Sequence, residues 1–357
     1  MMRLVLALVF ALVAGPAMAQ LTTTPSEVMR GAVNNFIRPA MADFGGKAAA
    51  LGVAVDELCA TPSQASLSVA DTAFGATALA FGRIEAIRVG PLMEDNRAER
   101  LLFWPDRKGI ALRQVQAILA DEDESATSLE TLKSKSVAVQ GLTALEFVLY
   151  GTGFETLATG EGNFRCRYGL AIAQSIAVVA DELVTAWAAD DGIALHLMKP
   201  SADFVDYRTP IEAQEELVGM IAHGIEAVRD TRLNPFLAKS DAAARPKLAL
   251  FWRSGLTVPM LRADVTGLQS LFALSGIAGG VPPDHVDLPL AIKAEFARAD
   301  AALALVIDPV ETAVADPVQA QALNDVVVAT QQLGALIGEQ LSTALGLSVG
   351  FSSLDGD

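Results

Sequence analysis

The sequence predicts an all-α protein made of two antiparallel helical bundles that pack together. Apolar residues recur at three- and four-residue spacing through most of the chain, which is the period of an amphipathic helix. No stretch alternates apolar and polar residues long enough to predict a strand. Hydrophobic residues make up 52% of the 357 positions and aromatic residues only 6%. A chain of this length can form two bundles with a substantial core.

The helical period and its interruptions divide the chain into two groups of helices. In the first group we predict helices at residues 26–59, 64–89, 108–121, 137–150 and 165–189. In the second group we predict helices at residues 210–229, 259–274, 290–306 and 317–345. Residues 191–209 lack sustained periodicity and are expected to link the bundles, which gives domains at residues 20–200 and 201–357. Pro39 and the Gly45-Gly46 pair are expected to kink or split the first helix.

The N-terminus, "MMRLVLALVFALVAGPAMAQ", has the pattern of a secretory signal peptide covering residues 1–19. A basic Arg3 precedes an apolar run, a Gly-Pro break follows, and the small residues Ala17 and Ala19 flank the expected cleavage site after Ala19. The apolar run is shorter than a membrane-spanning helix requires. We therefore expect an exported, periplasmic protein.

Charge limits the partners, and the two cysteines suggest a disulfide. The chain has 42 acidic and 26 basic residues, a net charge of −16, which argues against nucleic acid as a partner and is compatible with attraction of cations. Cys59 and Cys166 are the only cysteines, and an oxidising periplasm favours a disulfide between them. Two buried free thiols are the alternative.

Two acidic residues in apolar segments are the candidates for chemistry. Glu146 lies in "VAVQGLTALEFVLYG", with Thr143 one helical turn before it on the same face. A histidine at the position of Thr143 would complete a two-ligand metal clamp. Glu85 lies in "FGRIEAIRVGP", where Arg88 at i+3 can pair with it on a helix surface. Alternatively Glu85 faces the interior, where a carboxylate needs a partner.

Three further segments carry side chains of possible functional interest. Trp104 in "RLLFWPDRKGI" is a bulky anchor, and Asp106 is expected to cap the following helix. Arg165 begins the helix of "RCRYGLAIA", where a positive charge opposes the helix dipole and predicts an acidic partner. His223 and Glu226 in "HGIE" are spaced like a pair of metal ligands, a spacing that is also common by chance.

The order of these segments, together with "FIRPAMADF", "WRSGL" and "GFSSLDGD", resembles the imelysin-like family of bacterial exported proteins. That family is associated with iron uptake and was once assigned as metallopeptidases. The resemblance implies an all-α fold of two bundles with a functional site near a G-x-H-x-x-E motif. In "GLTALE", Gly141 and Glu146 match this motif and Thr143 stands in place of the histidine.

The threonine in place of the motif histidine determines which function we expect. A threonine hydroxyl is a poor ligand for a transition metal and cannot act as a general base near neutral pH. The resemblance therefore implies a non-catalytic binding protein of iron or haem uptake rather than a peptidase. The expected pocket holds Glu146, Thr143, Glu85, Arg88, Trp104 and Arg165.

The expected ligand is iron or another divalent or trivalent cation, because hard oxygen ligands suit such ions. Glu146 and Glu85 are the expected metal ligands, and another exported or outer-membrane iron-uptake protein is the expected partner. Two alternatives stay open. One is a metallopeptidase that uses His223 and Glu226. The other is a structural or partner-binding module in which Glu146 and Arg88 or Arg165 form a buried polar network.

Overall fold

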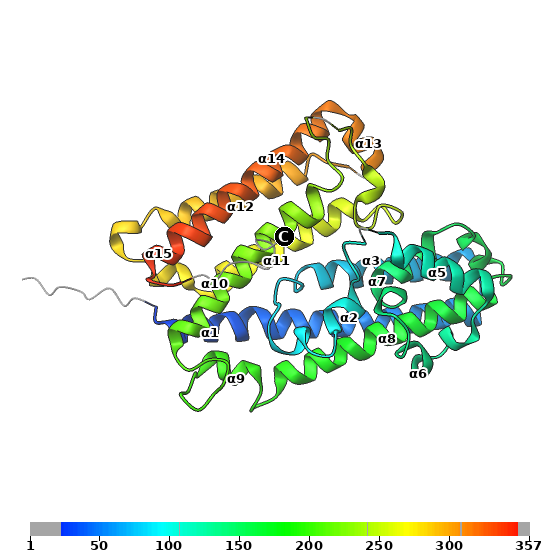
Figure 1. Ribbon diagram of the computed structural model, residues 1–357, viewed down its shortest axis with the longest axis horizontal. Helices are drawn as coiled ribbons and strands as arrows, with labels where there is room; N and C mark the ends of the chain where they lie inside the picture. The colour runs from blue at the N-terminus through cyan, green and yellow to red at the C-terminus, as the bar shows by residue number, and fades with distance from the viewer. Residues whose placement is uncertain (1–22, 107, 241, 308, 349–357) are drawn as a thin grey trace, which may run out of the picture.

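The computed structural model describes residues 23–348 apart from residues 107, 241 and 308. Two helical bundles lie against each other, the N-terminal one in blue to green and the C-terminal one in yellow-green to red (Figure 1). The described residues contain no strand beyond an isolated bridge between Lys239 and Ala242. The all-α, two-bundle prediction is confirmed. The predicted signal peptide and the final "GFSSLDGD" lie outside the described residues.

The first predicted helix is continuous but changes its hydrogen-bond pattern. It comprises α1 (Pro25–Gly31), a π-helical segment (Ala32–Ile37) and α2 (Arg38–Ala60). The π-helical segment ends two residues before Pro39, which has no backbone N–H to donate to the regular ladder. Gly45-Gly46 does not split the helix, because both residues lie inside α2.

The N-terminal bundle is built around α2 and α8 (Asn163–Ala188), which pack along each other. The helix α3 (Gln64–Gly82) packs on α2, and α7 (Gly141–Tyr150) packs on α8. A disulfide between Cys59 and Cys166, with the Cα atoms 5.6 Å apart, joins α2 to α8. The predicted disulfide is thus present. By length and composition α8 could cross a membrane, but half of its most apolar window is buried in the bundle.

Shorter elements connect α3 to α7. They are a 3₁₀ turn at Gly90–Met93, α4 (Arg97–Leu101), α5 (Ile110–Asp121), a 3₁₀ turn at Glu124–Ala126, α6 (Leu129–Leu132) and a 3₁₀ turn at Val137–Val139. The prediction of one helix through residue 89 is wrong in its second part, because α3 ends at Gly82. Ile84 and Ile87 keep a helical spacing and are buried, yet the backbone there forms turns. Tertiary packing has overridden the local pattern.

The C-terminal bundle follows its predicted order. Its elements are α10 (Pro210–Ala227) with a π-helical end (Val228–Leu233), α11 (Thr257–Ser275), α12 (Leu288–Leu303), α13 (Val310–Ala315), α14 (Pro317–Gly334), a π-helical segment (Ala335–Leu341) and α15 (Ser342–Ala344). The segment expected to be a linker contains a short helix, α9 (Ile193–Met198). The predicted helix at 317–345 corresponds to α14 and the two elements after it.

The two bundles meet where α11 packs on α3 and on the π-helical segment after α1, and where α10 packs on α1. Glycine permits this close approach. A Cβ at Gly267 of α11 would lie 2.3 Å from the carbonyl oxygen of Arg83, and one at Gly31 would lie 2.4 Å from that of Ser275. Any larger residue at either position would push the bundles apart.

Candidate functional site

A cleft of about 240 Å³ lies where α7 meets the loop that leads into α11. It brings together three of the six side chains expected in the pocket, Glu146, Thr143 and Trp104. Its other walls come from the segment before α5, from α5 itself and from residues 247–253. The cleft therefore combines an element of the N-terminal bundle with a loop of the C-terminal half.

Glu146 is buried, with 4% of its surface exposed, and its carboxylate is held by the loop. Its Oε1 accepts hydrogen bonds from the backbone N–H groups of Arg253 and Ser254, both at 3.1 Å, and from Ser254 Oγ at 3.0 Å. Burial raises the pKa of Glu146, while the bonds from Ser254 and the charge of Arg253 act in the opposite direction. The loop thus provides a preformed cradle for one carboxylate oxygen.

The backbone of the loop is bent to make this cradle. Phe251 has a positive φ of 57° and Gly255 one of 66°, so the chain turns on both sides of the two donating amides. Consecutive N–H groups in such a bend converge on one acceptor. The "WRSG" segment thus supplies the donors for Glu146, a role that the sequence analysis did not predict.

Arg253 also interacts with the second carboxylate oxygen of Glu146. Its Nη1 lies 3.8 Å from Glu146 Oε2, and its guanidinium stacks over the rings of Trp252, at 4.5 Å, and Phe147, at 5.3 Å. These aromatic faces hold the cation close to the carboxylate. Glu146 is therefore compensated by one guanidinium and three hydrogen-bond donors.

Thr143 lies one turn before Glu146 and lines the same cleft. Its Oγ1 is buried and has no hydrogen-bond partner in the described structure, which is uncommon for a buried hydroxyl. Gly141, the first position of "GLTALE", has a φ of 74°, and a Cβ there would lie 2.3 Å from the carbonyl oxygen of Arg100. The glycine lets α7 start directly against the end of α4.

The segment around Trp104 completes one wall. The indole N–H of Trp104 donates to the carbonyl of Thr231 at 3.3 Å, which fixes the ring across the two halves of the molecule. Asp106 accepts from the backbone N–H groups of Ile110 and Ala111, at 2.7 and 2.9 Å. The predicted capping role of Asp106 is confirmed.

Arg165 and Arg88 do not lie in this cleft. Arg165 donates to the carbonyl oxygens of Phe147, Val148 and Thr152, so it caps the C-terminal end of α7. The charge of Glu155 acts on it without a direct ion pair among the described residues. Arg88 is exposed and lies 3.9 Å from Glu99. The expected Glu85–Arg88 pair requires a helix at this point, and α3 has already ended.

Glu85 belongs to a second polar cluster. Both of its carboxylate oxygens accept from Arg232 Nη2, at 2.7 and 2.9 Å. Asp264 of α11 is buried beside this pair, and neither of its oxygens has a hydrogen-bond partner in the described structure. Burial raises the pKa of Asp264 well above its usual range, the charge of Glu85 raises it further, and Arg232 opposes this. Glu85 and Glu146 therefore have separate partners.

The histidines are dispersed. His196 contacts Asp206 at 2.8 Å and stacks on Phe204, while His285 lies 3.7 Å from Asp284. His223 is on α10. Within residues 23–348, outside the three omitted positions, no group of three or more His, Cys, Asp and Glu side chains could hold a metal ion.

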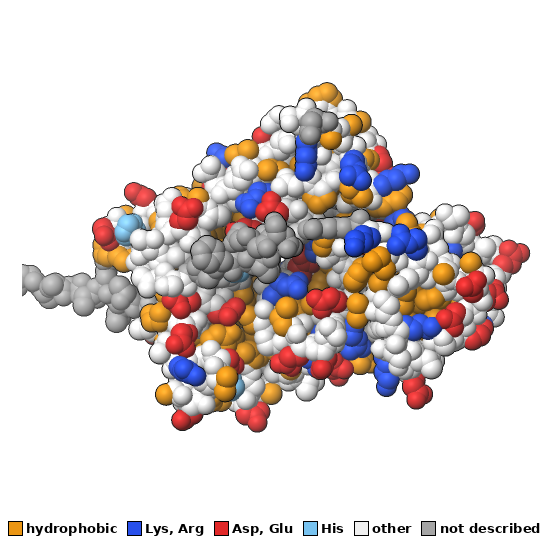
Figure 2. All heavy atoms as spheres, in the orientation of Figure 1, with side chains coloured by type: hydrophobic (Ala, Val, Ile, Leu, Met, Phe, Trp, Pro, Cys, Tyr) orange, Lys and Arg blue, Asp and Glu red, His pale blue; other side chains and the backbone are white. Residues whose placement is uncertain are grey.

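The surface shows how charge is distributed around these features. On the face in Figure 2, acidic side chains are spread over both bundles, and several Lys and Arg side chains gather on the right, where the bundles meet. The Glu146 cleft itself has two basic side chains in its wall, Lys247 and Arg253. The ammonium of Lys247 lies 5.4 Å from the ring centre of Trp252. The same wall contains two acidic side chains, Glu146 and Asp106, so the charges of the cleft balance.

The fold and the site define a class of two-bundle helical proteins with a carboxylate cleft at the junction of the bundles. The chain belongs to the imelysin family, because the family model described as Imelysin (Peptidase_M75) matches residues 37–337. No curated protein matches the chain.

Two solved structures share the fold at low sequence identity. An imelysin-like protein from Psychrobacter arcticum 273-4 superposes with a TM-score of 0.75 at 17% identity, over 91% of this chain and 97% of that one. A putative iron-regulated protein A precursor from Parabacteroides distasonis ATCC 8503 superposes with a TM-score of 0.73 at 16% identity, over 92% of this chain and 97% of that one.

Proposed function

We propose that this protein is an exported, periplasmic binding protein of iron or haem uptake, and that the Glu146 cleft is its ligand site. Support comes from the family, from the iron-regulated precursor with the same fold, and from the signal-peptide pattern of the N-terminus. The main observation in favour of this site is that the buried Glu146 carboxylate lines a cleft. The wall of this cleft also contains the Thr143 hydroxyl, which has no partner in the described structure.

The residues present do not fit a resident bare metal ion. Glu146 Oε1 already accepts three hydrogen bonds, and a guanidinium lies 3.8 Å from Oε2. Glu85, the second expected ligand, is bound to Arg232. A divalent or trivalent ion would therefore face one carboxylate, one hydroxyl and a positive charge. We propose that iron reaches this cleft as cargo that keeps ligands of its own.

The lining of the cleft supports such a ligand. Trp104, Phe147 and Trp252 provide apolar surface. Lys247 provides a positive charge, and Arg253 provides one that Glu146 already compensates in part. A small anionic complex with a flat organic part is complementary to these walls. The volume of about 240 Å³ lies below the usual range for drug-sized ligands, so haem would enter only after the loop moves.

Tryptophan fluorescence gives a direct test, since two of the three tryptophans line the cleft. The mature protein is titrated with ferrous ion, ferric nitrilotriacetate, zinc ion and haem. Ferric nitrilotriacetate leaves coordination positions of the iron open to a carboxylate such as that of Glu146. We therefore expect it to quench the wild type and to bind at least tenfold more weakly to Glu146→Gln. Glu85→Gln is the control and should keep the wild-type affinity. Equal affinity in Glu146→Gln would remove the cleft from the proposal.

A second candidate function is structural, and one observation favours it. The bonds of Glu146 join α7 of the N-terminal bundle to the loop before α11. A double-mutant cycle of Glu146→Gln and Ser254→Ala measures this link. A coupling energy above about 1 kcal/mol with no response to any ligand would favour a purely structural role. The metallopeptidase alternative gains no support from the site, because Thr143 offers no general base.

A further inference from the structure

A second and larger cleft, of about 740 Å³, lies in the N-terminal bundle between α4, α6 and α8. It shares no lining residue with the Glu146 cleft. Its volume is within the range of small-molecule binding sites. Neither the family motif nor the proposed iron-uptake function assigns a role to it.

A buried amide at the base of this cleft lacks an interaction. Gln140 has no exposed surface, and its Nε2 donates to the carbonyl of Lys135 at 3.1 Å. Its Oε1 is buried and has no hydrogen-bond partner in the described structure. An unpaired buried acceptor costs about 1–3 kcal/mol. A ligand that carries an O–H or N–H donor would satisfy it.

The cleft also contains an uncompensated guanidinium. Arg100 makes no ion pair with any described residue, and its Nε is buried without a partner. The neighbouring Arg97 takes up the acids, since it contacts Glu182 at 2.7 Å and Asp95 at 3.1 Å. Arg100 thus has no acidic partner among the described residues, although Glu130 lines the same cleft. A guanidinium offers the paired donors that match a carboxylate.

The remaining walls contribute one more cation, one acid and apolar surface. Glu130 is exposed on α6, and Lys133 is exposed just after this helix. Lys135 is already paired with Asp123 at 2.6 Å. Leu129, Val137 and Val178 give the cleft an apolar side.

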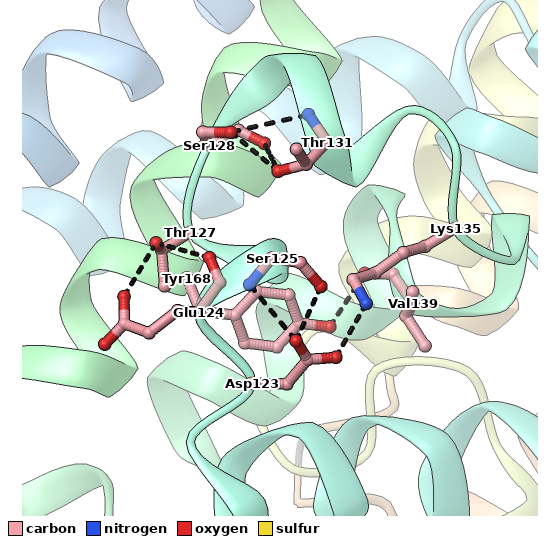
Figure 3. A network of polar contacts seen from close by, with 9 residues as sticks. All are labelled: Asp123, Glu124, Ser125, Thr127, Ser128, Thr131, Lys135, Val139 and Tyr168. Carbon is pink, nitrogen blue, oxygen red and sulfur yellow. Dashed lines mark hydrogen bonds and ion pairs between the residues drawn. The ribbon is translucent and has the colours of Figure 1, made fainter.

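Hydrogen bonds hold the loop that forms this wall (Figure 3). Lys135 and Ser125 both bind Asp123 and lower its pKa to about 2. The hydroxyl of Tyr168, on α8, donates to the carbonyl of Val139 at 2.8 Å. A wall fixed before the ligand arrives reduces the entropy that binding costs.

We propose that this cleft binds a small carboxylate that also carries a hydroxyl or amino group. The carboxylate pairs with Arg100, the hydroxyl or amino group donates to Gln140 Oε1, and a short aliphatic part lies against the apolar side. This arrangement selects hydroxy acids and amino acids over simple carboxylates, because a ligand without the donor leaves Gln140 unpaired.

Two matched sets of probes test the proposal by calorimetry on the mature protein. One set is malate, aspartate and succinate. The other is 2-hydroxy-4-methylpentanoate, leucine and 4-methylpentanoate. In at least one set we expect the hydroxy or amino acid to bind at least tenfold more tightly than the compound without the donor. This comparison uses only the wild type. Absence of binding by all six compounds, or equal affinities within both sets, would overturn the proposal.

Variants then assign the contacts. Arg100→Gln should weaken binding at least tenfold, and Gln140→Met should remove the preference for the donor. Glu146→Gln, in the other cleft, and Arg262→Gln, in an exposed pair with Asp300, are controls that should bind as the wild type does. Wild-type affinity in a folded Arg100→Gln protein would also overturn the proposal. Loss of binding in Glu146→Gln would instead place the ligand in the Glu146 cleft.

Discussion

Glu146 and Asp264 are both buried carboxylates near the junction of the two bundles, with 4% and 3% of their surface exposed, yet their surroundings are opposite. Glu146 accepts three hydrogen bonds from the loop at Arg253 and Ser254. Asp264 accepts none within the described structure. At the same degree of burial, the Glu146 carboxylate is stabilised by hydrogen bonds, whereas the Asp264 carboxylate has no hydrogen-bond donor in the described structure.

The difference shows what a buried acid needs in order to serve as a binding group. Around Glu146, one carboxylate meets one guanidinium and several donors. Around Asp264, two carboxylates, Asp264 and Glu85, share the guanidinium of Arg232, whose Nε and Nη1 have no partner in the described residues. The first arrangement can hold a negative charge, whereas the second favours a protonated Asp264.

The largest effect should come from removing the shared cation. Arg232→Met leaves Glu85 and Asp264 without their positive charge in a buried environment, so we expect the free energy of unfolding to fall by about 3–5 kcal/mol. Urea unfolding at pH 7 measures this. Arg262→Met, in an exposed pair, is the control and should cost less than about 1 kcal/mol. Similar losses in the two variants would mean that the cluster around Asp264 is no more demanding than a surface pair.

A somewhat smaller loss is expected on the other side of the comparison. Glu146→Ala leaves the N–H groups of Arg253 and Ser254 without an acceptor and creates a small cavity, so we expect a loss of about 2–4 kcal/mol. Glu146→Gln keeps an acceptor oxygen and should lose clearly less. If thermal and urea unfolding show equal losses for both variants, the hydrogen bonds to the loop are not what stabilises this region.

The pH dependence of stability should report on both buried acids. The pKa of Asp264 is raised above its usual 3.8, so in the range above 3.8 the folded state binds more protons than the unfolded state. The contribution of Asp264 to stability is therefore complete below about pH 3.8 and is lost as the pH rises through its folded-state pKa. Asp264→Asn should show a shallower fall in the free energy of unfolding between pH 4 and 8.

Glu146 has a raised pKa as well and contributes a slope of the same sign. Part of the pH dependence should therefore persist in Asp264→Asn and diminish further when Glu146→Gln is added. Unfolding curves at one-unit pH intervals for the single and double variants test this. A wild-type slope in Asp264→Asn would mean that Asp264 is already charged in the folded protein at pH 4.

Much of the fold could be predicted from local sequence patterns. The helical period located most helices, the two cysteines suggested the bond between α2 and α8, and Asp106 was recognised as a cap because its partners are four and five residues away. The end of α3 was missed because Ile84 and Ile87 keep the helical spacing inside a turn. Periodicity reports which side chains are buried, and it does not report the backbone that buries them.

The candidate site was predictable to a lesser degree. An acid in an apolar helix indicated that Glu146 is buried, but its donors at Arg253 and Ser254 lie more than 100 residues away, and no local pattern names them. The same signal is present around Asp264, in "VPMLRADVTGLQ", although Asp264 is not among the predicted site residues. Arg88 and Arg165 were assigned to the pocket from their motifs, although their contacts lie elsewhere.

The smallest expected effect concerns the hydroxyl that stands in the place of the family histidine. Thr143→Val removes a buried oxygen without a partner, so we expect the free energy of unfolding to change by less than about 1 kcal/mol, toward greater stability. Thr257→Val is the matched control, because Thr257 Oγ1 is equally buried but donates to the carbonyl of Leu250 at 2.7 Å. It should lose about 1 kcal/mol.

The pair of threonine variants also bears on the cleft. If Thr143 serves only packing, Thr143→Val should bind ferric nitrilotriacetate as the wild type does. If its hydroxyl contacts the ligand, binding should weaken while stability is kept or improved. The second outcome is the one we expect, because Thr143 lines the cleft beside Glu146 and its hydroxyl has no hydrogen-bond partner among the described residues.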